Sequence, residues 1–290
     1  MMKETRLMTE RPQAPASRAS AGGGVVTDKM IIGLSGVLET KSGERVGTMG
    51  VGKDTLADYL SEKYCGVKVA LADPIKRVCQ AVYDFSDEQL WGKSKYRNAL
   101  DRRYLRRHSY VLTNYEGNQV EICECCQYAP GISPKPDDPD LCYLTPRYAI
   151  QKLGTEWGRG CYLNTWVDYA LRVATLLLKE PYEYSYKKGL LLRSQAKPTK
   201  LVVVPDIRYK NELQAIKNAE NGRCVRIVRV IADNYPPRSP HCSEQDLLEV
   251  PDSFFDQVIY NDADLALLSL RADQAMARLH GKIIEYDEAQ

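Results

Sequence analysis

The sequence predicts an α/β fold: a doubly wound, mainly parallel sheet with helices on both faces. Two observations lead to this prediction. Short apolar runs alternate along the chain with segments of helical periodicity. The run Leu201–Val204 is apolar at every position, which is typical of a parallel strand covered on both faces. With 290 residues, 44% of them hydrophobic, the chain can bury the core that such a sheet requires.

The strands are predicted from apolar runs that end at glycine, proline or a polar residue. In chain order they are 30–35, 67–72, 201–205, 224–230 and 257–260. The helices are predicted from apolar stripes or from start signals, such as Ser86 as an N-cap or Thr145 before Pro146. In chain order they are 53–64, 74–83, a short helix after 86, 146 to a stop at Gly154, 164–179, 210–219 and 265–279.

These elements predict one domain over residues 30–275. Residues 1–29 are rich in Arg, Ala, Ser, Pro and Gly and are predicted to be a disordered tail, which makes Met30 a candidate start. Residues 276–290 are expected to form a C-terminal tail. Three segments interrupt the alternating pattern and are predicted to be insertions: 37–49, about 93–144, and 181–199, the last as a polar loop. The second of these is expected to contain a hairpin around 114–118.

The charge and hydropathy patterns exclude several classes of protein. A formal net charge of +2 gives nucleic-acid binding no global electrostatic support, so such binding would need a local patch. No run of about 18 to 20 apolar residues is present, which predicts no membrane span. Because residues 1–29 also lack the apolar region of a secretory signal, we expect a cytoplasmic protein whose nine cysteines are reduced.

The segment Gly50–Thr55 joins the first strand to the first helix and has the composition of a P-loop. The backbone N–H groups of such a turn, together with the helix dipole, bind anionic oxygens. We therefore predict that ATP binds to Gly50, Val51, Gly52, Lys53, Asp54 and Thr55. Lys53 would reach the β- and γ-phosphates, and Asp54 and Thr55 would hold magnesium. The alternative is an ordinary glycine turn before a helix.

The start of this loop is ambiguous. The first strand is expected to end at Gly36, whereas the Gly-Lys pair arrives only at Gly52. In one register the loop starts at Gly47, and residues 37–46 form an extra hairpin that turns at 41–44. In the other register Gly36 starts the loop, and about a dozen residues are inserted within it.

Several segments together resemble the deoxynucleoside monophosphate (dNMP) kinases of tailed bacteriophages, including the T-even type. The similarity covers about residues 30–275 in order, apart from the insertions. The segments are Ile32–Gly36 with Gly52–Thr55, Val69–Lys76, Arg147–Gln151, Leu153–Glu156, Thr165–Val167, Val204–Arg208 with Asn211 and Glu212, Ser243 with Glu244, and Ile259–Asp262. The resemblance implies a P-loop kinase fold, transfer of the γ-phosphoryl group of ATP to a dNMP with magnesium, small-molecule nucleotides as partners, and a homodimer.

Ligands of doubly wound folds bind beyond the carboxyl ends of the strands, and phosphoryl transfer needs cations around the transferred group. The predicted catalytic residues are Lys53, Asp206, Arg208 and Arg147. The predicted substrate-binding residues are Asp73, Lys76, Arg77, Arg147, Gln151, Glu156 and Arg159. The alternatives are a turn residue for Asp73, an N-cap or a partner of Arg208 for Asp206, and solvated surface charges for the arginines. Trp157 and Trp166 are expected to be buried rather than stacked on a base.

Two clusters lie in the long insertion. Arginines at 102, 103, 106 and 107 indicate a solvated helix face or a lid over ATP, with nucleic-acid contact as a third interpretation. Cys123, Cys126 and Cys142 are candidate ligands of a structural zinc ion, with His108 or Cys125 as the fourth ligand. The spacing of these cysteines matches common zinc motifs poorly, so reduced thiols without metal are the competing interpretation.

Other functions fit the same motifs. A P-loop kinase could act on another acceptor, such as dephospho-coenzyme A or a modified base in DNA. A nucleotide-binding regulatory or DNA-packaging module could carry the same loop without kinase activity.

Overall fold

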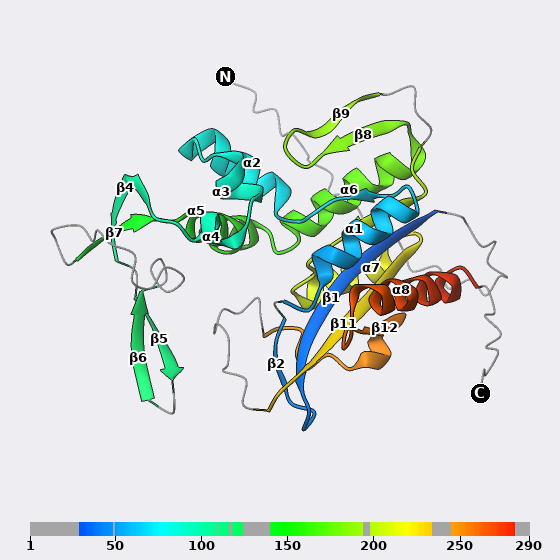
Figure 1. Ribbon diagram of the computed structural model, residues 1–290. Helices are drawn as coiled ribbons and strands as arrows, with labels where there is room; N and C mark the ends of the chain where they lie inside the picture. The colour runs from blue at the N-terminus through cyan, green and yellow to red at the C-terminus, as the bar shows by residue number, and fades with distance from the viewer. Residues whose placement is uncertain are drawn as a thin grey trace, which may run out of the picture.

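The computed structural model describes residues 29–48, 50–108, 110–115, 118–123, 140–193, 198–233 and 245–281 (Figure 1). Apart from Lys29, the N-terminal tail predicted at 1–29 lies outside the described residues. No helix in these ranges is both long and apolar enough to cross a lipid bilayer.

A six-stranded sheet forms the centre of the molecule, and β1 (Met30–Thr40) lies in its middle. Five strands run parallel in the order β12–β11–β1–β10–β3, and β2 pairs antiparallel with β1. The other strands are β2 (Arg45–Gly47), β3 (Val67–Lys68), β10 (Leu201–Val204), β11 (Gly222–Ile231) and β12 (Gln257–Tyr260). The predicted strand 67–72 was too long, because only its first two residues pair with β10.

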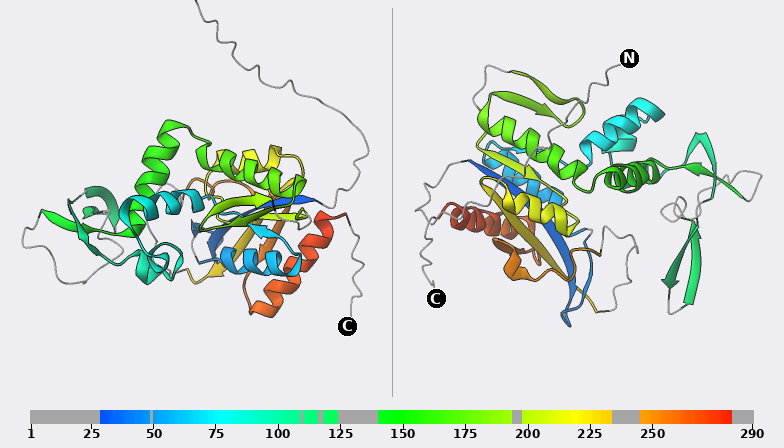
Figure 2. Two further views of the ribbon diagram at one scale, coloured as in Figure 1. Left: turned by 90° about the horizontal axis from the view of Figure 1, so that it is seen from above. Right: turned by 180° about the vertical axis from the view of Figure 1, so that it is seen from behind.

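Helices cover both faces of the sheet, which confirms the predicted doubly wound α/β fold (Figure 2). On one face, α1 (Lys53–Lys63) and α8 (Leu265–Leu279) pack on alternate β1 residues such as Ile32 and Leu34. On the other face of the sheet, Ile31 packs in a second hydrophobic cluster. The helices of that cluster are α2 (Asp73–Tyr83), α3 (Asp87–Trp91), α5 (Pro146–Gln151), α6 (Thr165–Lys179) and α7 (Lys210–Asn218).

The first strand continues beyond its predicted end. β1 passes Gly36 and reaches Thr40, because β11 pairs with it along its whole second half, as far as Ile231. The chain then turns at 41–43 and returns through β2. The hairpin expected for the register that begins at Gly47 is therefore confirmed.

The long insertion forms strands outside the central sheet. It contains α4 (Ser94–Arg97), β4 (Asp101–Arg107), β5 (Tyr110–Tyr115), β6 (Asn118–Cys123) and β7 (Leu141–Leu144). β4 pairs with β7, and β5 pairs with β6 in the hairpin predicted around 114–118. The arginine cluster at 102–107 lies on a strand, so the predicted helix face was wrong.

Two further features differ from the predictions. The segment 181–199 contains a hairpin of β8 (Tyr182–Ser185) and β9 (Gly189–Arg193) rather than only a loop. The α8 helix continues to Leu279 with Met276 buried, so the domain does not end at 275. A short 3-10 helix, η3 (Asp252–Phe254), precedes β12.

Gly154 does not stop the helix that begins after Thr145. The chain continues from α5 into a π-helical segment, Lys152–Arg159. The indole N–H of Trp166 donates to the Gly154 carbonyl at 2.7 Å, so a side chain supplies a hydrogen bond within this segment. Such wide turns occur often at functional sites.

Candidate active site

A cavity of about 1270 Å³ opens at the carboxyl ends of β3, β10 and β12. One wall is the turn Gly50–Thr55, and the opposite wall comes from α4, α5 and the π-helical segment. Seven basic and five acidic residues line it, an excess of positive charge that suits an anionic ligand. The basic residues are Lys53, Lys76, Arg97, Arg147, Arg159, Arg208 and Arg229.

The glycine turn has a backbone that side-chain-bearing residues rarely adopt. Gly50 and Gly52 have φ values of 75° and 97°. Arg229 Nη1 donates to the Gly50 carbonyl at 2.7 Å, and Asn261 Nδ2 donates to the Val51 carbonyl at 2.9 Å. In a trans peptide the N–H points opposite to the C=O. These two bonds therefore turn the next N–H groups away from Arg229 and Asn261.

The start of α1 adds further donors to the same turn. Its N-cap is Gly52, which has no side chain to accept from the first-turn N–H groups. The first four N–H groups of a helix have no partner inside the helix, and the dipole places partial positive charge there. The turn and the helix start together meet the requirements of an anion site.

Gly36 on β1 contacts this turn directly. A Cβ atom on Gly36 would lie 2.2 Å from Val51 Cγ2 and 3.3 Å from the Lys53 side chain. The two glycines that competed for the start of the loop thus have different places: Gly47 ends β2 just before the turn, and Gly36 lies against it.

Lys53 and Asp206 face each other in the cavity. Lys53 Nζ donates to the Thr48 carbonyl at 2.5 Å and lies 3.4 Å from Asp206 Oδ1. Asp206 follows β10 with a φ of 70°, and its Oδ2 accepts from Arg208 Nη2 at 2.7 Å. Enclosure by protein opposes ionisation, but the adjacent Arg208 and Lys53 overcome it and hold the pKa of Asp206 well below its usual range. Asp206 is therefore a fixed negative charge between two cations.

Arg147 and Gln151 line the opposite wall, one turn apart on α5. Arg147 Nε donates to Asn98 Oδ1 at 2.6 Å, which orients the guanidinium from the insertion. Lys76 on α2 also lines this wall, and burial lowers its pKa while the charge of Asp73 opposes that shift.

Arg159 lines the cavity but is anchored by α7. Its guanidinium stacks 3.5 Å from the Tyr209 ring centroid and pairs with Glu212 at 3.3 Å. Glu212 also accepts from the backbone N–H groups of Arg208 and Tyr209, at 3.0 and 3.2 Å. Burial raises the pKa of Glu212 to about 7, against the opposing effect of those donors. Through Glu212, these contacts link Arg159 to the backbone segment that contains Arg208 and Tyr209.

Three predicted substrate-binding residues are described but do not line the cavity. Asp73 is buried and accepts from Ala70 N–H and the Tyr184 hydroxyl. Arg77 donates to the Tyr186 carbonyl, and Glu156 pairs with Lys152 on the surface. Desolvation raises the pKa of Asp73, while the Tyr184 hydroxyl and Lys76 oppose that shift.

Some residues that line the cavity were not predicted from the sequence. Arg97 and Asn98 come from the insertion, where no motif could be recognised. Asn261 and Asp262 follow β12 and were quoted only as part of a matching segment. Trp166 is buried as expected, whereas Trp157 is 58% exposed, so the expected burial of Trp157 was wrong.

Comparison with known proteins adds one relative. A protein of Acanthamoeba polyphaga mimivirus, named "Putative deoxynucleotide monophosphate kinase", is 24% identical to the chain over 187 residues. The match covers 63% of this chain and 72% of the viral protein. No family model matches the chain.

Proposed function

We propose that this chain transfers the γ-phosphoryl group of ATP to a deoxynucleoside 5'-monophosphate, giving dNDP and ADP for viral DNA precursor synthesis. The cavity is the observation that carries the proposal, because it joins a glycine turn suited to an anion to arginine side chains on a facing wall. The name of the mimivirus relative agrees with this activity. A cytoplasmic homodimer with small nucleotides as its partners is part of the same proposal.

The donor nucleotide would bind at the turn. The N–H groups of Gly50–Thr55 and the Lys53 ammonium would neutralise its phosphate oxygens. Magnesium prefers oxygen ligands, and the exposed side chains of Asp54 and Thr55 offer them in the first turn of α1. The metal would supply charge neutralisation between the β- and γ-phosphates.

The acceptor phosphate would bind arginine side chains that line the cavity. Arg147 and Arg208 both line the cavity, and Gln151 lies one helical turn from Arg147 to meet a base. A monophosphate is largely ionised at neutral pH, since its second pKa is about 6. Its oxygen can therefore attack the γ-phosphorus without a general base. Asp206 instead would hold Lys53 and Arg208 in place until nucleotides bind.

Coupled assays of ADP production with a panel of acceptors test this proposal. The panel contains the four dNMPs, hydroxymethylated pyrimidine monophosphates, dephospho-coenzyme A and duplex DNA. We expect turnover only when a free dNMP is present, with the dNDP identified by chromatography. Turnover only with DNA or with dephospho-coenzyme A would replace the proposed acceptor. ATP binding with no turnover on any acceptor would make the chain a regulatory module.

Replacing Gly52 with alanine is expected to weaken ATP binding at least tenfold. A Cβ at this position would lie 2.6 Å from Asn261 Nδ2, the group that holds the Val51 carbonyl. The positive φ adds strain of about 1–3 kcal/mol. Titration with a fluorescent ATP analogue measures the affinity.

Gly43→Ala is the matched control, because Gly43 has a φ of 90° in the β1–β2 turn and an added Cβ meets nothing within 4 Å. This variant should lose a similar amount of stability yet bind ATP normally. Equal loss of ATP affinity in both variants would show that backbone strain alone, rather than the geometry of the phosphate turn, is responsible.

A further inference from the structure

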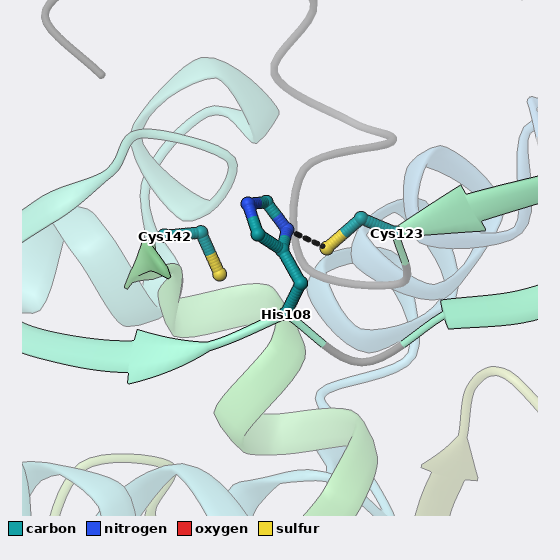
Figure 3. Close-up of side chains that lie close together, drawn as sticks. All are labelled: His108, Cys123 and Cys142. Carbon is teal, nitrogen blue, oxygen red and sulfur yellow. Dashed lines mark hydrogen bonds between the residues drawn. The ribbon is translucent and has the colours of Figure 1, made fainter. Parts of the chain in front are cut away.

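Three side chains that could bind a metal gather in the insertion, away from the cavity. The metal-binding atoms of His108, Cys123 and Cys142 all lie within 4.8 Å of one another, and His108 Nδ1 is 2.8 Å from Cys123 Sγ (Figure 3). His108 and Cys123 are partly buried, and Cys142 is 3% exposed. None of these three residues is among those that line the cavity.

The backbone brings the three residues together from separate strands. His108 follows β4, and its N–H donates to the Asp140 carbonyl beside β7 at 3.0 Å. Cys142 on β7 pairs with Arg106, and Cys123 pairs with Tyr110 where β5 and β6 meet the rest of the insertion. The cluster thus lies where the β5–β6 hairpin joins the β4–β7 pair.

We propose that His108, Cys123 and Cys142 bind a structural zinc ion. Imidazole and thiolate are the preferred zinc ligands, and in a tetrahedral site bonds of about 2.0–2.3 Å place ligand atoms about 3.5–3.8 Å apart. The metal-binding atoms of the three residues lie within 4.8 Å of one another, so small side-chain rotations would bring them to that spacing. The three described residues supply three of the four ligands of a closed zinc site. Cys126, predicted as a ligand, lies outside the described residues.

The position of the site explains what the metal would do. A two-stranded hairpin is only marginally stable alone, and β5–β6 stands apart from the central sheet in Figures 1 and 2. A metal ion at its base would fasten it to β4 and β7. The same base supports α5: Arg106 lies 4.0 Å from Cys142 Sγ and donates to the Tyr148 hydroxyl at 2.7 Å. The zinc ion would thereby hold the helix that carries Arg147.

Metal analysis of the full chain tests the proposal directly. We expect about one zinc per chain after purification without chelator. After chelation, added cobalt should produce the sulfur-to-cobalt charge-transfer absorption of a thiolate site. His108→Ala and Cys123→Ser should each lower the zinc content at least fivefold, whereas Cys161→Ser, at an exposed cysteine, should retain it. Cys142→Ser removes a buried group, so its result counts only if circular dichroism shows a folded chain.

Several outcomes would overturn the proposal. These are less than about one-tenth zinc per chain with no cobalt band, or full zinc content in both His108→Ala and Cys123→Ser. A Cys123–Cys142 disulfide in the protein as purified without chelator, seen by mass spectrometry, would also contradict it. Metal content is measured without any nucleotide, so these results are independent of the proposed kinase activity.

Discussion

The Lys53→Ala variant is expected to lose phosphoryl transfer by about 100-fold or more in kcat, the usual effect of removing one group that stabilises transition-state charge. Lys53 is the one ammonium at the start of α1, its side chain is 10% exposed, and it lies beside the glycine turn and Asp206. Its loss would leave Asp206 next to the phosphates with one neutralising cation fewer. Steady-state kinetics with a dNMP and magnesium-ATP measure the change.

Lys63→Ala is the matched control for this variant. Lys63 ends the same helix and pairs with Asp273 on the surface, far from the cavity residues. Exposed pairs contribute at most about 1 kcal/mol, so both stability and activity should be nearly unchanged. If Lys53→Ala retained full activity while remaining folded, the proposed role of the turn in phosphoryl transfer would be wrong.

Among the proposed single variants, Asp252→Ala is expected to lower the free energy of unfolding most. Arg226 on β11 is almost completely buried, and its Nη1 pairs with Asp252 Oδ1 at 2.7 Å. Asp252 Oδ1 also pairs with Arg45 at 2.8 Å. Breaking a buried ion pair costs about 3–5 kcal/mol, and we expect the lower end, about 3 kcal/mol, because Asp252 is one-third exposed. For a domain of this size the melting temperature should fall by about 6–12 °C.

Two further variants separate the buried charge from general damage at this site. Combining Asp252→Ala with Arg226→Met removes both charges, and we expect it to recover part of the lost stability because no unpaired guanidinium stays buried. Asp58→Ala breaks an exposed pair with Lys68 and should cost at most about 1 kcal/mol. Thermal unfolding in one buffer compares the three. A double variant less stable than Asp252→Ala alone would show that the packing of Arg226 and its hydrogen bonds to the Val250 and Leu247 carbonyls outweigh the buried charge.

Much of the fold could be predicted because its signals are local. The apolar runs of β1 and β10, the Ser86 and Thr145 caps and the hairpin around 114–118 all depend on neighbouring residues. The errors arose where distant chain segments decide the local structure. β1 extends to Thr40 because β11 pairs with it, and the helix continues past Gly154, whose carbonyl accepts from the distant Trp166 indole.

The candidate site shows the same division. The turn Gly50–Thr55 and the charged residues at the end of β10 could be recognised from their spacing and from the strands before them. The structure brings Arg97 and Asn98 from the insertion to the cavity, and it leaves Asp73, Arg77 and Glu156 outside the lining. Side-chain type alone cannot distinguish these groups, since both contain charged residues.

By itself the sequence determined that the sheet is mainly parallel, the order of helices and strands along the chain, and the glycine turn before α1. These features could be predicted because hydrophobic periodicity and backbone preference act over a few residues. Only the tertiary structure decided that Gly36 lies against that turn, that Asn98 orients Arg147, and that His108 joins Cys123 and Cys142. The physical reason is that these contacts join residues far apart in the chain. Their geometry is set by strand pairing and packing, which no local pattern records.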